Sequence, residues 1–220
     1  MIRVQKYLLL GIIMLMFVLN VMACIANADT PTKITPPIFS TSQMQTLADG
    51  RVLISVEKVI DKTGKSARVS SSVEINASPE TIWAVLIDCQ RSPTYVPGLK
   101  KCEILQEAKD KSWDIRRHTN KPAVFLPKMI SEFRCDYDFA KSIRFISVGG
   151  DMDTNTGSWT LRVNKDGSKT IVTYNARIAA KTVVPDKMIR KVMKKNVPKV
   201  MQALRQEVMR DKAKLSDKSK

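Results

Sequence analysis

The stretch Ser72–Leu105, SVEINASPETIWAVLIDCQRSPTYVPGLKKCEIL, holds the residues that decide the fold. An alternation of apolar and polar residues ends at Ala77. Ser78-Pro79-Glu80 then supplies an N-cap serine and a first-turn proline, which together start a helix. Ser92-Pro93 ends that helix, and Pro97-Gly98 marks a turn before the next strand. The stretch therefore predicts a strand, a helix, a turn and a second strand in quick succession.

Regular alternation continues on both sides of this stretch. Upstream, Arg51–Ile60 and Ser66–Ala77 alternate about a turn at Asp61–Lys65, which predicts a strand hairpin. Alternation of this kind is typical of antiparallel strands with one face buried and the other in water. Downstream, further strands are expected at Leu99–Glu107, Ser112–His118, Lys128–Phe139, Ser142–Val148, Thr154–Val163 and Thr170–Thr182.

The period changes to that of a helix between Asp186 and about Lys212. Apolar residues recur there every three or four positions on one side, and lysines and arginines occupy the other. An antiparallel sheet of this length has to curl, and a long amphipathic helix covers its concave face. With 220 residues, of which 44% are hydrophobic and 26% charged, the chain is expected to fold as one domain with appendages.

Several short motifs carry a resemblance to a known family. They are the Ala77–Glu80 run "ASPE", the aromatic Trp83, the turn Tyr95–Gly98, the strand Gly157–Leu161 and the long C-terminal helix. In this order they resemble the SRPBCC (START-like) superfamily, in its branch related to polyketide cyclase/dehydrase and coenzyme-Q-binding proteins. The resemblance covers roughly residues 52–210. It implies an α+β helix-grip fold, in which a curved antiparallel sheet wraps a long C-terminal helix around an internal hydrophobic cavity.

The N-terminus has the features of a secretory signal. Arg3 and Lys6 precede the uncharged run Tyr7–Leu19, and small residues follow at Ala26-Asn27-Ala28. We therefore predict a signal peptide over 1–28 and export, to the periplasm of a bacterium. An uncleaved membrane anchor and a lipoprotein acylated at Cys24 are alternatives, and each of them also exports the rest of the chain. The other predicted parts are a proline-containing extension over 29–50, the helix-grip domain over 51–212 and a basic tail over 213–220.

Three cysteines follow the predicted signal. In an oxidising compartment Cys89 and Cys102, the closer pair in sequence, are expected to form a disulfide, which leaves Cys135 over. Three free, buried thiols are the alternative. The cysteines lack the spacing of a metal site, and the chain contains one histidine, so we predict no metal and no cofactor.

Alternation, together with the resemblance, predicts which side chains face the cavity. A ligand cavity needs a large apolar volume with few polar groups. The alternative is an ordinary filled core. The residues expected to bind the ligand are Trp113, Met129, Phe133, Tyr137, Phe145, Trp159, Tyr174, Met193 and Val197.

Binding of a hydrophobic molecule is the predicted function. The resemblance implies an exported binding or carrier protein for a lipid, an isoprenoid or a quinone. Two alternatives are a cyclase- or dehydratase-like enzyme on the same fold and an interaction protein that binds no ligand. The alternation places no Asp, Glu or His inside the cavity and leaves His118 in solvent, so no catalytic residue is predicted. The net charge of +16 favours contact between the basic C-terminal helix and an anionic membrane, and export argues against nucleic acid.

Overall fold

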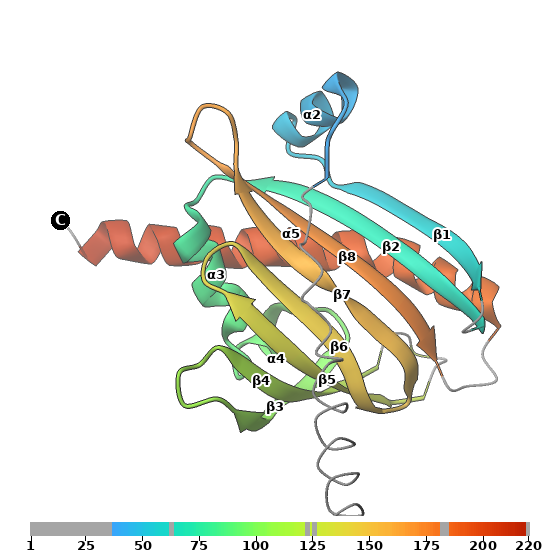
Figure 1. Ribbon diagram of the computed structural model, residues 1–220. Coiled ribbons are helices and arrows are strands. Elements are labelled where there is room, and N and C mark those ends of the chain that lie inside the picture. The colour runs from blue at the N-terminus through green and yellow to red at the C-terminus, as the bar shows by residue number, and fades with distance from the viewer. Residues whose placement is uncertain (1–36, 62–63, 122–123, 125–126, 181–184, 219–220) are drawn as a thin grey trace, which may run out of the picture. The chain divides into compact units, whose positions relative to one another are not determined.

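One curved antiparallel sheet organises the structure, a computed structural model that describes residues 37–61, 64–121, 124, 127–180 and 185–218. Figure 1 shows its strands curving past the long C-terminal helix. In chain order the strands are β1 (Leu53–Asp61), β2 (Gly64–Ile75), β3 (Leu99–Glu107), β4 (Trp113–Asn120), β5 (Met129–Asp138), β6 (Ser142–Gly150), β7 (Met152–Val163) and β8 (Thr170–Ala180). Their order in the sheet is β1-β2-β8-β7-β6-β5-β4-β3, so β1 and β3 are its edges. The predicted helix-grip architecture is therefore confirmed.

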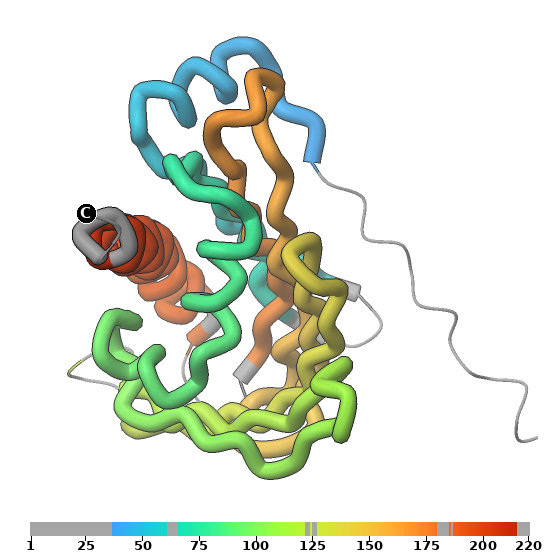
Figure 2. Tube along the Cα trace, turned by 90° about the vertical axis from the view of Figure 1, so that its left-hand side faces the viewer, coloured from blue at the N-terminus to red at the C-terminus, as the bar shows by residue number. Residues whose placement is uncertain are grey.

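The helices in the described ranges each contact the sheet. They are α2 (Thr41–Ala48), α3 (Pro79–Ile87), α4 (Ser92–Tyr95) and α5 (Asp186–Lys218). Helix α5 contacts β1, β2 and α3, and Figure 2, which looks along this helix, shows the sheet curving around one side of it. The helix continues through Pro198, and no helix in the described ranges is both long and apolar enough to cross a membrane.

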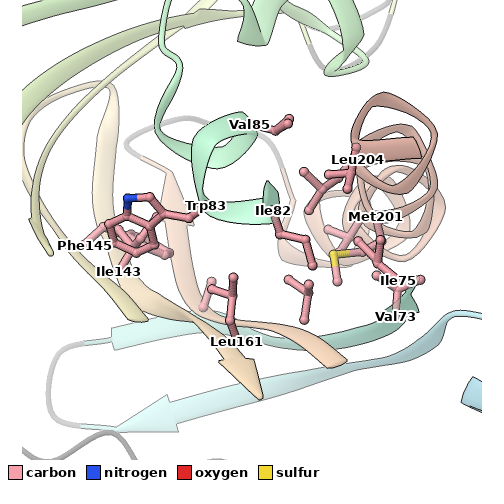
Figure 3. Close-up of a cluster of buried hydrophobic side chains, with 14 of the residues drawn as sticks. Val73, Ile75, Ile82, Trp83, Val85, Ile143, Phe145, Leu161, Met201 and Leu204 are labelled. Carbon is pink, nitrogen blue, oxygen red and sulfur yellow. The ribbon is translucent and has the colours of Figure 1, made fainter. Parts of the chain in front are cut away.

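The core joins α3, α5 and the sheet. Ser78 caps α3 by accepting a hydrogen bond from the Thr81 amide, and Pro79 opens the first turn, as the sequence predicts. Met201 and Leu204 of α5 are fully buried and point towards Ile82 of α3 in Figure 3. Because α3 packs against α5 here, the remaining length of α5 is held over the concave face of the sheet.

Several strand ends differ from the sequence expectation by one or two residues, and three differences concern the ends of the domain and the last strand. The extension predicted over 29–50 contains the helix α2, which starts with a capping box. The Ser40 hydroxyl accepts from the Gln43 amide at 3.3 Å, and the Gln43 side chain accepts from the Ser40 amide at 2.9 Å. Helix α5 extends to Lys218, into the predicted tail over 213–220. Strand β8 ends at Ala180, and Lys181 and Thr182, which the sequence included in this strand, lie outside the described residues, as does the predicted signal over 1–28.

The edge strand β3 pairs irregularly with β4. Its register shifts between Leu99 and Lys101 and again between Ile104 and Gln106. Such shifts bend a strand and interrupt its line of hydrogen-bonding groups. Helix α4 contacts β3 at this edge of the sheet.

Candidate functional site

A cavity of about 340 Å³ lies between the concave face of the sheet, helix α5 and the segment from α4 to the start of β3. This volume falls in the range of small-molecule sites, which are apolar with few polar groups. The sheet contributes aromatic residues, and α5 contributes Ile189, Val192, Met193, Val197 and Met201. The cavity therefore has the size and lining that binding of a hydrophobic molecule requires.

Aromatic packing shapes the wall of the cavity on β6, β7 and β8. The rings of Phe145 and Tyr174 stack with centroids 5.9 Å apart, and Trp159 tilts against Tyr174 at 4.7 Å. Phe145 lies over Gly157, where a Cβ atom would come within 2.7 Å of its ring. Glycine at this position of β7 leaves the space that the Phe145 ring and the backbone of β8 at Asn175 and Ala176 occupy.

Most of the residues that the sequence assigns to the cavity do line it. These are Met129, Phe133, Tyr137, Phe145, Trp159, Tyr174, Met193 and Val197. Trp113 does not line the cavity. The face of β4 that points inward is the one opposite to the face predicted from the sequence. The ring of Trp113 lies on the outer face beneath the Arg134 guanidinium, 4.4 Å from its centroid. A register error of one residue reverses every side chain of a strand.

The inward face of β4 carries polar residues, which corrects the expectation of a cavity without acidic or imidazole groups. Asp114 and Arg116 are 4% and 7% exposed, and His118, expected in solvent, lines the cavity. The sequence contained one signal for this arrangement. Asp114 and Arg116 lie two residues apart on one strand, where opposite charges can neutralise each other inside a protein.

Asp114, Arg116 and Tyr137 form a closed hydrogen-bonded cluster. Arg116 Nε donates to both oxygens of Asp114 at 2.9 Å, and Arg116 Nη2 donates to Tyr137 Oη at 2.6 Å. Tyr137 Oη in turn donates to Asp114 Oδ2 at 2.7 Å, and Arg116 Nη2 also reaches the Ile87 carbonyl at 2.8 Å. The buried charges of Arg116 and Asp114 therefore face each other, and each also has a neutral hydrogen-bond partner in Tyr137.

The pKa values of two members of the cluster, Arg116 and Tyr137, lie above their ordinary values. Burial alone would lower the pKa of Arg116, but its hydrogen bond to Asp114 and the neighbouring groups outweigh burial and raise that pKa above its ordinary value. Burial raises the pKa of the Tyr137 phenol, so Tyr137 keeps the proton that it donates to Asp114. Arg116 therefore keeps its charge and Tyr137 keeps its proton at neutral pH, so neither of these two groups is available as a base.

His118 and Cys135 border the same cavity in their uncharged forms. Burial and the nearby Arg116 lower the pKa of His118 to about 4, so the imidazole is neutral at pH 7. Burial raises the pKa of the Cys135 thiol to about 12, which keeps it from being a thiolate nucleophile. In the described part of the chain, no three His, Cys, Asp or Glu side chains gather in an arrangement that would hold a metal ion.

The segment between α3 and β3 forms one wall and is fixed at several points. A disulfide joins Cys89 to Cys102 with their Cα atoms 5.4 Å apart, and Tyr95, Val96 and Pro97 inside its loop line the cavity. Tyr95 Oη donates to the Val85 carbonyl at 3.1 Å. The wall is thus fastened both to β3 and to α3.

Ion pairs of Arg91 connect this wall to α5. Arg91 Nε donates to Glu207 at 2.6 Å, and its two terminal nitrogens donate to Asp211 at 2.6 and 2.7 Å. Glu207 is 4% exposed, so the ion pair between Arg91 and Glu207 is partly removed from solvent. The bidentate contact to Asp211 adds geometric specificity. None of these three residues stood out in the sequence, because their partners are more than a hundred positions away in the chain.

Solved structures with the same fold agree with this architecture. A STAR-related lipid transfer protein from Xanthomonas axonopodis is 16% identical, with a TM-score of 0.61 over 72% of this chain and 93% of that protein. The Zhui aromatase/cyclase from Streptomyces sp. R1128 is 19% identical, with a TM-score of 0.57 over 65% and 93%. A START superfamily protein from Mycobacterium smegmatis is 21% identical, with a TM-score of 0.57 over 65% and 97%.

Comparison with curated protein sequences gives no match. A family profile does match, over residues 75–205, and this range runs from the end of β2 to the second half of α5. It therefore includes α3, the disulfide-closed wall and every strand that lines the cavity. The chain belongs to the family described as polyketide cyclase / dehydrase and lipid transport.

Proposed function

We propose that the protein is an exported carrier that holds a hydrophobic small molecule of the lipid, isoprenoid or quinone class. The observation that supports this most directly is the cavity of about 340 Å³, walled by aromatic and aliphatic side chains from the sheet and α5. Sites of this kind bind by burying apolar ligand surface. Met129, Met152, Met193 and Met201 all line it, and flexible thioethers adapt to ligands of different outline.

An enzyme of the cyclase or dehydratase type is the second candidate, and one observation favours it. The cavity has polar groups of the kind that catalysis uses, in Arg116, His118 and Tyr137. The charge and protonation states of these three side chains support ligand binding instead of catalysis. Arg116 is neutralised by Asp114, Tyr137 holds its proton, and an imidazole with a pKa of about 4 is a weak base at neutral pH.

Native mass spectrometry of the full chain, produced with export and purified from the exported fraction, tests the carrier proposal. We expect a discrete additional mass that solvent extraction releases as a lipid, an isoprenoid or a quinone. A protein that emerges empty and also takes up none of a panel of lipids and quinones would overturn it. Conversion of an extracted ligand into a cyclised or dehydrated product would favour the enzyme.

Export is part of the proposal and has its own support. The Cys89–Cys102 disulfide persists in oxidising compartments and is rare where thiols are kept reduced. The motif predicted to direct export lies within residues 1–28. We propose the periplasm as the site of action, and fractionation of cells that express the full chain tests this.

Contact with an anionic membrane follows from the charge of α5. Lys187, Lys191, Lys194, Lys195 and Lys199 are all exposed along its first half, which also lines the cavity. No acidic residue occurs between Lys187 and Gln206. Each lysine held near an anionic bilayer contributes about 1 kcal/mol of attraction. We propose that this half of α5 faces the membrane when the ligand is exchanged.

Sedimentation with vesicles measures this contact. The variant Lys191→Gln/Lys194→Gln/Lys195→Gln is expected to bind anionic vesicles roughly 100-fold more weakly than the unchanged protein. A charge-matched control, Lys100→Gln/Lys109→Gln/Lys165→Gln, removes three exposed lysines that do not belong to α5 and should bind nearly as well as the unchanged protein. Equal recovery with anionic and neutral vesicles, or equal losses in the two variants, would exclude the proposed surface.

A further inference from the structure

Three polar side chains from neighbouring parts of the sheet meet at one place on the cavity wall. They are His118 of β4, Ser131 of β5 and Asn155 of β7, and all three line the cavity. His118 and Ser131 are direct cross-strand partners, and Asn155 Nδ2 donates to Ser131 Oγ at 3.4 Å. We refer to these three residues as the polar corner.

His118 has an unmet hydrogen-bonding atom in this corner. Its Nε2 is buried and has no hydrogen-bond partner in the part of the chain that the structure describes. The His118 ring packs edge-on against Phe133, with centroids 4.7 Å apart. This contact buries the apolar surface of the imidazole but gives Nε2 no hydrogen bond. A buried polar atom without a partner costs free energy, so such an atom beside a ligand cavity calls for an explanation.

The charges around the cavity determine whether the ligand group that bonds to His118 Nε2 is ionic or neutral. Arg116 is the permanently charged group among the described lining residues, and its guanidinium is already bound to Asp114, Tyr137 and the Ile87 carbonyl. His118 is itself neutral at pH 7. A carboxylate or phosphate placed here would be buried without an opposite charge, which is strongly unfavourable. A hydroxyl or a carbonyl oxygen carries no such cost.

We infer that the polar corner recognises an uncharged oxygen, a hydroxyl or a carbonyl, of an otherwise hydrophobic ligand, through a hydrogen bond to His118 Nε2. Ser131 and Asn155 hold the position beside it and supply further polar contacts. Nε2 is buried whereas His118 lines the cavity, so this hydrogen bond requires the imidazole to turn Nε2 towards the ligand oxygen. The inference rests on the proposed function and narrows the ligand to neutral alcohols, ketones or quinones.

A series of probes with equal chain length separates these possibilities. Decane, decan-1-ol and decanoate are compared by their displacement of the fluorescent apolar probe N-phenyl-1-naphthylamine from the full protein. We expect decan-1-ol to bind about tenfold more tightly than decane, which is the usual value of one hydrogen bond, and decanoate to bind more weakly than decan-1-ol. In His118→Leu the preference for decan-1-ol over decane should disappear, and in His118→Gln, which keeps a polar group, part of it should return.

A second measurement needs no variant. The chain contains a single histidine, so a long-range ¹H–¹⁵N spectrum shows one imidazole. Saturation with decan-1-ol is expected to shift the Nε2 resonance, and saturation with decane is not. If the naphthylamine and all three probes fail to bind, the carrier proposal itself fails. If they bind, but decane and decan-1-ol bind equally and Nε2 does not move, or decanoate binds most tightly, the carrier proposal survives and the polar corner is refuted.

Discussion

Replacing Asp114 by asparagine is expected to lower the free energy of unfolding by about 3–5 kcal/mol, because it leaves the charge of Arg116 buried without its partner. Arg116 is 7% exposed, and both its Nε bonds end on the Asp114 carboxylate. The phenol of Tyr137 also loses its charged acceptor. Equilibrium unfolding in urea measures the change, provided that the slope of the transition is unaltered.

A surface pair on the adjacent strand offers a matched control. Arg134 and Asp136 are also two residues apart and 2.9 Å from each other, but about 40% of each side chain is exposed. Asp136→Asn should therefore cost less than about 1 kcal/mol. The double variant Asp114→Leu/Arg116→Met removes both buried charges and should recover much of the stability that Asp114→Asn loses. A similar small cost for Asp114→Asn and Asp136→Asn would show that Asp114 does not neutralise Arg116.

Loss of the Cys89–Cys102 disulfide is expected to lower the free energy of unfolding by about 3 kcal/mol, the chain-entropy value for a loop of this length. The variant is Cys89→Ser/Cys102→Ser. The bridge closes a sequence separation of 13 that contains α4 and six lining residues of the cavity. Thermal unfolding measures the loss. Arg91 still ties residues 90–101 to α5 in the variant, so the fold as a whole should persist. Hydrogen exchange should therefore show the loss of protection within residues 90–101.

Reduction of the unchanged protein is the companion experiment. A reductant should lower its melting temperature to that of the double serine variant and leave the variant itself unchanged. Cys135→Ser, which removes the buried free thiol, should keep the full response to reductant. If the reductant has no effect on the unchanged protein, or if Cys135→Ser abolishes the response, the bridge between Cys89 and Cys102 does not carry this stability.

The sequence predicts the fold well because its signals are local. Capping at Ser78, alternation in β5 and the period of α5 each need only a few neighbouring residues, and the limits of β3 agree with the prediction. The pairing of Cys89 with Cys102 is also present in the structure, and proximity in the chain favoured it. Eight of the nine predicted lining residues lie on the cavity for the same reason. Alternation decides the face of a strand for six of them, and helical periodicity decides the face of α5 for Met193 and Val197.

The face of β4 could not be predicted in this way. Trp113 and Ile115 are apolar and alternate with Asp114 and Arg116, so burial of the apolar pair is the simpler interpretation. The structure reverses it because Asp114 and Arg116 neutralise each other and Tyr137, from the next strand, completes their hydrogen bonds. That compensation depends on strand pairing, which a single strand does not reveal. The environment of His118 follows from the same reversal.

The open sheet leaves two edges, and the form of one of them has a consequence for solubility at high concentration. Ile104 and Leu105 are exposed on β3, where a second copy of the chain would otherwise add its own strand. The two register shifts of β3 twist that edge, and Lys100, Lys101 and Glu103 place charges along it. Edge-to-edge self-association into extended aggregates is therefore opposed by geometry and charge together.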